Sequence, residues 1–356
     1  MREKASSPVT GTAESYGNRI AWLWRVFVIV FALIASPASA QETIVLVGSG
    51  SSVPLPLYNR WILEYGKRNP KIQVKYLPIG ASEGIKAISH GSGDFGAGEV
   101  PLSAKERSEA GLTELPVVII AIVPIYNLPE VHQALRLSGE VLAEIFLGDV
   151  KTWDAPPIAK LNPGVPLPRL PIQVVVRPAG KGSNYIFTEF LSKVSPKFRT
   201  QVGVGPSPKW PVGVPAERSS DMVDKVMSQP STIGYVELQY AVKGNVPYAA
   251  VQNLAGKFVS ASAQSIKDAC EAVEAPHWNS FSASLTNAPG AGSFPITSFT
   301  WIYVHTESAD PARAAALDDF LQWIYTDGQQ FAAQEGYSEL PQALLAAVRK
   351  KAKTLQ

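Results

Sequence analysis

The sequence has a single cysteine, Cys270, and only four histidines among 356 residues. One cysteine permits no intrachain disulfide, so a folded domain of this size depends on its apolar core, which a 46% hydrophobic composition allows. We interpret Cys270 as a small buried apolar residue rather than a reactive thiol. Histidine, cysteine and carboxylate side chains show no metal-ligand spacing, so we expect neither a metal nor a cofactor.

The chain also lacks a net charge once its first forty residues are set aside. Residues 1–40 hold four of the 32 Lys/Arg and two of the 30 Asp/Glu, which leaves 28 basic and 28 acidic side chains. A nucleic-acid binder normally carries a basic excess or stripe, so we expect no nucleic-acid partner. Any preference for an anion must therefore come from a local site.

The N-terminal segment 1–40 has the pattern of a signal peptide. Two arginines precede a short apolar core at 26–35, and Ala38, Ser39 and Ala40 fit the small-residue rule for cleavage before residue 41. The apolar core is short for a membrane span, although an uncleaved N-terminal anchor stays open as an alternative. The sequence therefore predicts export to the periplasm.

Glycine-rich loops follow three predicted strands, and a helix pattern follows each loop. The strands are Thr43–Val47, Ile72–Leu77 and Ile172–Val176, and the third runs directly into Arg177. Backbone N–H groups at a helix start lack intrahelical partners and carry the positive end of the helix dipole, so such loops suit an anion. In open α/β sheets these loops lie at the carboxyl ends of the strands. We expect the three to converge on one small anion.

The mature length, about 316 residues, exceeds what one core usually holds, so we expect two lobes. The apolar run Pro116–Tyr126 predicts a central strand that crosses between them and changes over at Pro124, and Pro295–Val304 predicts the return crossing. We also expect helices at Leu135–Phe146 and after Asp310, the second stopped by Gly328.

Two segments are similar to catalytic motifs. The segment 80–84 reads GASEG, which fits the G-x-S-x-G nucleophile elbow and makes Ser82 a candidate nucleophile. No histidine stands in a context that recommends it as the base. The segment 180–183 reads GKGS, which lacks the spacing of a phosphate-binding P-loop. We therefore expect a binding protein, with a periplasmic phosphatase or serine hydrolase using Ser82 as the less favoured alternative.

Longer motifs resemble one known family across essentially the whole mature chain. These are GSGSSVPLPLYNRW, DFGAGEVPLS, IYNLP, IFLGDVKTWDAPPIAKLNPGVPLP, RPAGKGSNYIFTEFLS, KWPVG, IGYVELQYA and PITSFT. They are similar to motifs of the periplasmic phosphate-binding proteins of phosphate ABC transporters. The resemblance implies an α/β, two-lobe, type II periplasmic-binding-protein fold: lobe 1 from 41–125 and 291–356, lobe 2 from 126–290, and two crossing strands between mixed sheets flanked by helices.

The resemblance also implies a set of ligand-binding residues in the three loops and at the strand end after DFGAG. They are Ser51, Ser52, Val53, Ala81, Ser82, Glu99, Arg177, Lys181, Gly182 and Ser183. Four positions depart from the family: Ala81 replaces a serine, Glu99 an aspartate, Ala179 the aspartate that braces the arginine, and Lys181 a serine. These departures keep a different oxyanion or a phosphorylated small molecule open as the ligand.

Glu99 and Lys181 have testable physical roles in such a site. A carboxylate facing the ligand accepts the proton that hydrogen phosphate carries and sulfate lacks, so Glu99 would select between them. Lys181 would add a charge-assisted contact to the anion, pair with Glu99, or point into solvent. These three alternatives stay open on the sequence alone.

The function expected from the sequence is capture of inorganic phosphate, or a related oxyanion, between two lobes for import. The partners would be the membrane subunits of an ABC permease, and the protein itself would be a monomer that closes by a hinge motion near 125–127 and 290–295. The alternative is a binder of a different oxyanion or of a phosphorylated small molecule.

Overall fold

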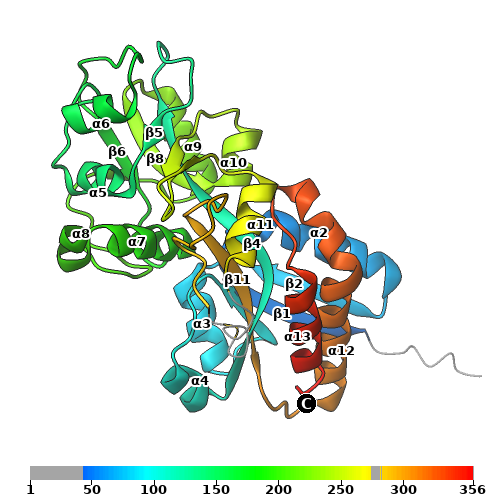
Figure 1. The fold of residues 1–356 in the computed structure, drawn as a ribbon. Coiled ribbons are helices and arrows are strands. Elements are labelled where there is room, and N and C mark those ends of the chain that lie inside the picture. Colours follow the sequence, from blue (N-terminus) through cyan, green and yellow to red (C-terminus); the bar gives the residue numbers. More distant parts are fainter. Residues whose placement is uncertain (1–42, 274–280, 282, 356) are drawn as a thin grey trace, which may run out of the picture. The chain divides into compact units, whose positions relative to one another are not determined.

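The computed structural model describes residues 43–273, 281 and 283–355 (Figure 1). They belong to one compact unit, Thr43–Gln356. The expected signal peptide, 1–40, lies outside the described residues. Within the described ranges, no helix combines the length and the apolar character that a membrane crossing requires.

Two sheets form the framework, and they confirm the expected mixed α/β class. The larger has the strand order β2-β1-β3-β11-β4-β8-β6-β7, and the smaller has the order β10-β9-β5. The strands are β1 Ile44–Gly50, β2 Ile72–Leu77, β3 Phe95–Gly98, β4 Leu112–Asn127, β5 Arg136–Leu137, β6 Gln173–Val176, β7 Val214–Pro215, β8 Thr232–Glu237, β9 Ala250–Gln252, β10 Phe258–Val259 and β11 Thr297–His305.

The long strand β4 joins the two parts of the large sheet. Its first part, Leu112–Ala121, pairs with β11 across one irregularity at Val117, and its last six residues pair with β8, both in antiparallel register (Figure 1). The partner changes between Ala121 and Ile122, so the changeover lies a little before the predicted Pro124. The structure confirms the predicted central strand as β4 and a strand at the predicted return segment as β11. All of β4 except Asn127 is buried, which explains why it reads as a continuous apolar run.

Helices connect the strands and cover the sheets. They are α2 Leu55–Arg68, α3 Ala81–Ser89, α4 Ala104–Ala110, α5 Gly139–Leu147, α6 Pro156–Leu161, α7 Gly182–Val194, α8 Pro196–Gln201, α9 Ser219–Ser228, α10 Leu238–Lys243, α11 Ala263–Glu271, α12 Pro311–Trp323 and α13 Gln342–Ala352. Three of them, α2, α3 and α7, follow the three glycine-rich loops, as expected.

Two helix predictions need correction. The helix expected from Leu135 begins only at Gly139, because Ser138 caps it and the residues before it form β5. The C-terminal helix starts as predicted, since the Asp310 side chain accepts the N–H groups of the first turn. It ends at Trp323 and passes into a π-helical turn, Ile324–Gly328, rather than stopping at the glycine.

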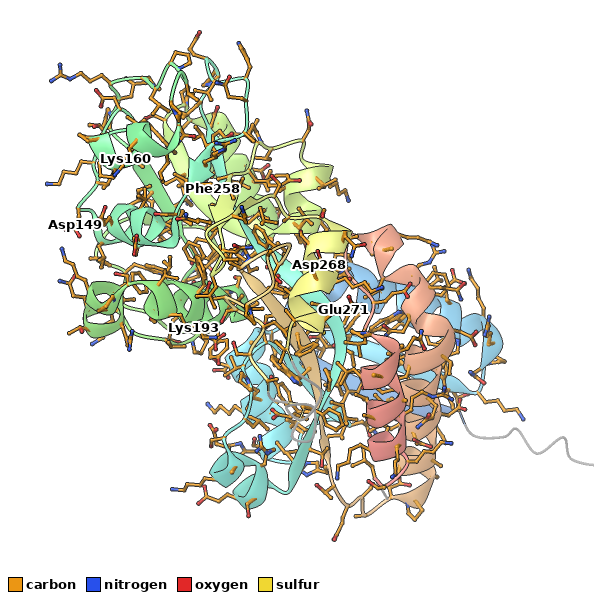
Figure 2. All side chains as sticks on the ribbon, in the orientation of Figure 1. Asp149, Lys160, Lys193, Phe258, Asp268 and Glu271 are labelled. Atoms are coloured by element: carbon orange, nitrogen blue, oxygen red, sulfur yellow. The ribbon has the colours of Figure 1, made fainter. Side chains whose placement is uncertain are left out.

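Side-chain contacts fasten α7 to the chain leading into β11. Lys193, labelled near the end of α7 in Figure 2, donates hydrogen bonds to the Ser284 and Thr286 side chains at 2.7 and 2.6 Å. Thr286 in turn donates to Glu189, one helical turn before Lys193. The helix that follows the arginine-bearing loop is therefore held at its far end.

Candidate functional site

The first loop, Ser51–Val53, is a turn held by its own side chain. Ser51 is buried, its N–H donates to the Ala97 carbonyl at 2.9 Å, and its hydroxyl accepts the Val53 N–H at 3.1 Å. Ser52 is half-buried. The Val53 N–H, expected to face an anion, therefore has a partner within the loop.

The second loop places the start of α3 against the third loop. Gly80 has φ +107° and donates its N–H to the Gly50 carbonyl at 2.8 Å, which links the ends of the first two loops. Ala81 is fully buried. The Ser82 N–H donates to the Gly180 carbonyl at 3.4 Å, so residues about one hundred positions apart meet here.

Glu99 follows β3 and is fully buried. Neither of its carboxylate oxygens has a hydrogen-bond partner among the described residues. Burial raises the pKa of Glu99 to about 8; the Ser51 hydroxyl opposes this shift and the charge of Glu237 adds to it. Burying a carboxylate without hydrogen-bond partners costs free energy, so we expect a hydrogen-bond donor to bind at this position.

The third loop brings Gly182 directly against Glu99. A Cβ atom built on Gly182 would lie 1.6 Å from Glu99 Oε2 and 2.7 Å from its Cδ. Only glycine permits this approach, although its φ is ordinary. Gly182 is also the first residue of α7, so the carboxylate stands beside a helix N-terminus. The next residue, Ser183, is buried with an unpartnered hydroxyl.

Arg177 is buried and fixed by neutral acceptors. Its Nη1 donates to the Ser219 hydroxyl and its Nη2 to the Glu217 carbonyl, both at 3.0 Å, while its backbone N–H donates to the Tyr235 hydroxyl at 3.1 Å. Its Nε is buried without a partner. Ala179 stands where the family resemblance implies an aspartate beside this arginine. No carboxylate among these contacts therefore offsets the guanidinium charge.

Lys181 forms an ion pair with Glu217, with 3.6 Å between Nζ and Oε2. The partner lies in the segment after β7 and is not Glu99, so the side chain adopts an arrangement outside the three alternatives given above. The Lys181 N–H donates to the Pro206 carbonyl at 3.2 Å. These contacts therefore direct neither the ammonium group nor the backbone N–H of Lys181 toward an anion.

Sequence reasoning missed Glu237, the last residue of β8. It is fully buried, and both of its carboxylate oxygens lack a hydrogen-bond partner among the described residues. The signal was present, because the strand 233–237 ends in a carboxylate as the strand before Glu99 does. Two residues later, Gln239 donates to the Val53 carbonyl at 3.4 Å and so reaches the first loop.

The interpretation of Ser82 as a catalytic nucleophile requires a histidine nearby to act as its general base. His90 directly follows α3 as its C-cap residue, and its Nδ1 is 2.7 Å from the Lys86 carbonyl. His277 lies outside the described residues. Among the residues that are described, no histidine is recorded in a hydrogen bond to Ser82, and no group of three His, Cys, Asp or Glu could hold a metal ion.

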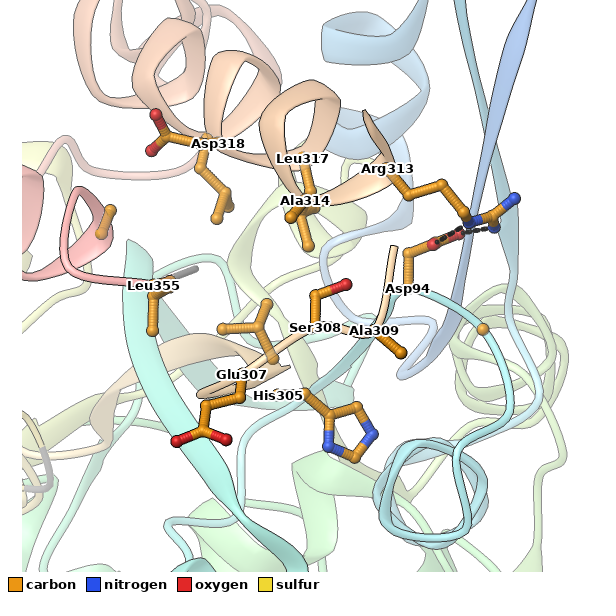
Figure 3. Close-up of a pocket in the computed structure, with 14 residues that line it drawn as sticks. Asp94, His305, Glu307, Ser308, Ala309, Arg313, Ala314, Leu317, Asp318 and Leu355 are labelled. Atoms are coloured by element: carbon orange, nitrogen blue, oxygen red, sulfur yellow. Dashed lines mark hydrogen bonds and ion pairs between the residues drawn. The ribbon is translucent and has the colours of Figure 1, made fainter. Parts of the chain in front are cut away.

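A separate pocket of about 290 Å³ lies at the amino end of β3 (Figure 3). Asp94 and Arg313 form an ion pair on its wall, with 2.6 Å between Nη2 and Oδ2. Asp94 also accepts the Val47 N–H. Since Glu99 stands at the opposite end of the same strand, this pocket is distinct from the converging loops.

Comparison with known proteins places the chain among solute-binding proteins. The model of the PBP superfamily domain matches residues 35–328. A phosphate-binding protein PstS of Xylella fastidiosa is 35% identical over 316 residues, covering 88% of this chain and 86% of that protein. Another of Pasteurella multocida is 36% identical over 327 residues, covering 92% and 94%.

Solved structures share the fold at lower identity. A high-affinity periplasmic phosphate-binding protein bound with phosphate matches with a TM-score of 0.68 and 21% identity, over 86% of this chain and 93% of that one. A putative phosphate ABC transporter substrate-binding protein of Clostridium perfringens, with bound phosphate, matches with a TM-score of 0.60 and 18% identity, over 83% and 100%.

Proposed function

Because the chain belongs to the PBP superfamily and, within it, to the PstS family of phosphate-binding proteins, we propose that it captures inorganic phosphate at the converging loops. Phosphate would then pass to the membrane subunits of an ABC permease. The chain acts by binding and release, with no catalytic step.

A cluster of buried polar atoms without partners carries the proposal. Around the loops these atoms are Glu99 Oε1 and Oε2, Glu237 Oε1 and Oε2, Arg177 Nε and Ser183 Oγ. Leaving one buried polar group unsatisfied costs about 1–3 kcal/mol. Donors and acceptors are both present, so a protonated oxyanion that accepts from some groups and donates to others satisfies them together.

The donor side of the site comes from Arg177, Ser183 and the N-terminus of α7. The guanidinium supplies a fixed positive charge, and its two neutral partners orient it without cancelling that charge. Ser183 supplies a hydroxyl within the first turn of α7. The N-terminal ends of α7 and α3 add helix-dipole attraction for an anion. Ser51, Ser52 and Val53 of the first loop and Ala81 and Ser82 of the second loop would complete the site.

The acceptor side is Glu99. An ionised carboxylate accepts the proton of hydrogen phosphate and repels sulfate, which has none. Since Glu99 itself holds a proton up to about pH 8, the rejection of sulfate by this residue strengthens above that pH.

Two lobes would close over the ligand, lobe 1 from 41–125 and 291–356 and lobe 2 from 126–290. The partner change of β4 between Ala121 and Ile122 supports a hinge at the crossing strands, close to the segments 125–127 and 290–295. The protein would act as a monomer in the periplasm after removal of residues 1–40.

A different oxyanion or a phosphorylated small molecule is the second candidate. The observation that favours it is the unbraced arginine: with Ala179 in place of a carboxylate, Arg177 keeps its full charge for the ligand. A more highly charged anion would then bind well. The close approach of Gly182 to Glu99 favours a small ligand over a bulky ester.

Isothermal titration calorimetry of residues 41–356 tests the proposal. The protein is stripped of anion by partial unfolding and dialysis, then titrated with phosphate, sulfate, arsenate and pyrophosphate. We expect tight binding of phosphate and no heat with sulfate. If phosphate gives no heat of binding while another anion does, phosphate is rejected as the ligand. Turnover of a chromogenic phosphate ester that Ser82→Ala abolishes would instead establish the hydrolase.

A further inference from the structure

Two buried carboxylates, Glu99 and Glu237, stand at strand ends near the converging loops, although the family resemblance assigns a ligand role only to Glu99. Glu237 shares with Glu99 full burial and two oxygens without partners in the described chain. It ends β8 and precedes α10, yet its side chain accepts no capping hydrogen bond from that helix. No structural role among the described contacts therefore explains a charged group at this position.

The sheet register places Glu237 among the site residues. It pairs with Ile122, the first residue of β4 after the strand leaves β11. The neighbouring parallel strand, β6, leads into Arg177 at the same edge of the sheet. On the next turn Gln239 contacts the Val53 carbonyl. Glu237 thus lies between the loop that holds the arginine and the loop that follows β1.

Several titratable groups face Glu237 from different elements. Its negative charge raises the pKa of Glu99 after β3, of Tyr235 on its own strand, of Tyr240 on α10 and of Tyr337 near the C-terminus, in each case after the larger effect of burial. Arg177 lowers the pKa of Tyr235 and Tyr240, so its positive charge reaches the same place.

The charges around the anion do not balance without a further proton. Lys181 is paired with Glu217. The positive charge of Arg177 therefore stands against the negative charges of two carboxylates, Glu99 and Glu237. An ionised carboxylate only accepts hydrogen bonds. The hydrogen phosphate dianion carries one proton, which satisfies one carboxylate and leaves the other facing an anion.

We propose that Glu237 is a second acceptor of the bound anion, and that phosphate binds with one proton more than the hydrogen phosphate dianion carries. The inference rests on the proposed function and names a further specificity-determining residue of that site. The extra proton comes from solvent and resides on Glu99 or on the phosphate. No covalent bond forms or breaks besides the bond to that proton. Sulfate needs two such protons, so the pair rejects it more strongly than Glu99 alone.

The titration of Glu99 sets the pH at which this uptake becomes visible. Because burial holds its pKa at about 8, the site already carries the extra proton at neutral pH. Above that value the proton has to be taken up as phosphate binds. The affinity for phosphate therefore falls about tenfold for each pH unit between about pH 8.5 and 9.5, as linkage to one proton requires.

Calorimetry at about pH 9 in two buffers of different ionisation enthalpy measures the protons taken up per phosphate. We expect about one for the wild-type protein and about none for Glu237→Gln, whose remaining carboxylate is satisfied by the proton of the ligand. Glu114→Gln is the matched control, because Glu114 is also buried with a pKa raised to about 7 but has Leu102 and Arg107 as partners. It keeps the wild-type proton number.

Equal proton numbers in the wild-type protein and in folded Glu237→Gln overturn the inference. If that variant does not fold, the wild-type pH series decides, and an affinity that stays flat above pH 8.5 overturns it. A wild-type protein that binds no phosphate rejects the proposed function itself. Phosphate binding without the extra proton leaves the function intact and removes only the role of Glu237.

Discussion

Substitution of Gly182 by alanine tests the contact on which the candidate site is built. The added Cβ would overlap Glu99 Oε2 at 1.6 Å and approach the Glu99 Cβ at 3.1 Å. The carboxylate is the mobile end of its side chain, so it is expected to move first. Glu99 would then turn away from the anion while the backbone of α7 stays in place.

The size of the effect follows from the cost of overpacking. Forcing an extra methyl group into a closely packed site costs about 1–3 kcal/mol. If that cost falls on the ligand-bound arrangement, the affinity for phosphate drops by about 5- to 150-fold. Glu99 is buried and has only its interaction with the Ser51 hydroxyl to lose, so thermal stability should change less than affinity.

Calorimetric affinity and thermal unfolding, measured on the same samples, separate the two effects. Gly66→Ala is the matched control, because a Cβ on Gly66 meets nothing within 4 Å in α2. The same chemical change there should stabilise the protein by about 0.5–1 kcal/mol and leave phosphate affinity unaltered.

A rescue variant sharpens the test of Gly182→Ala. Glu99→Asp shortens the side chain by one methylene, so in the Gly182→Ala background it should recover part of the lost affinity. A folded Gly182→Ala protein with wild-type affinity would refute the reasoning. It would mean that Glu99 does not contact the anion when phosphate is bound.

Three further predictions concern charge. Arg177→Lys removes the forked donor, and calorimetry should show at least a tenfold loss of phosphate affinity; a smaller loss would mean that a point charge suffices. Lys181→Ser should leave anion preference and thermal stability close to those of the wild-type protein, because the ammonium group is paired with the exposed Glu217 carboxylate; an altered ligand profile in calorimetry would place the side chain in the site. Without phosphate, chemical denaturation should show stability falling as pH rises from about 5 to about 8, because the folded protein retains protons on Glu99 and Glu114 that the unfolded chain has lost. Glu99→Gln should flatten this dependence, and a slope unchanged in that variant would assign it to other groups.

The three strand-loop-helix units were predictable from the sequence because their signals are local. An apolar β-branched run, a glycine turn and a helical period each occupy a few adjacent residues. The glycine at position 182 followed from family motifs, yet the reason for it did not. Its φ is ordinary, and only the close approach of Glu99, 83 positions away, excludes a side chain.

The partners of the charged side chains could not be predicted, since they depend on tertiary placement. Arg177 is oriented by residues 217 and 219, and Lys181 pairs with Glu217, all brought in by the segment after β7. No sequence pattern near residues 177–183 indicates that their side chains contact that segment. The changeover in β4 was misplaced by a few residues for the same reason, because hydrogen-bonding partners rather than Pro124 determine it.

The departures around the arginine are physically connected. In the family resemblance an aspartate braces this arginine and offsets its charge; here Ala179 stands at that position and neutral oxygens orient the guanidinium. The charge freed in this way is available to balance a second carboxylate at the site, and Glu237 supplies one. If the two features compensate each other, Ala179→Asp should weaken phosphate binding in the wild-type protein and weaken it much less in Glu237→Gln. Equal losses in both backgrounds, measured by a double-mutant cycle, would show that they are independent.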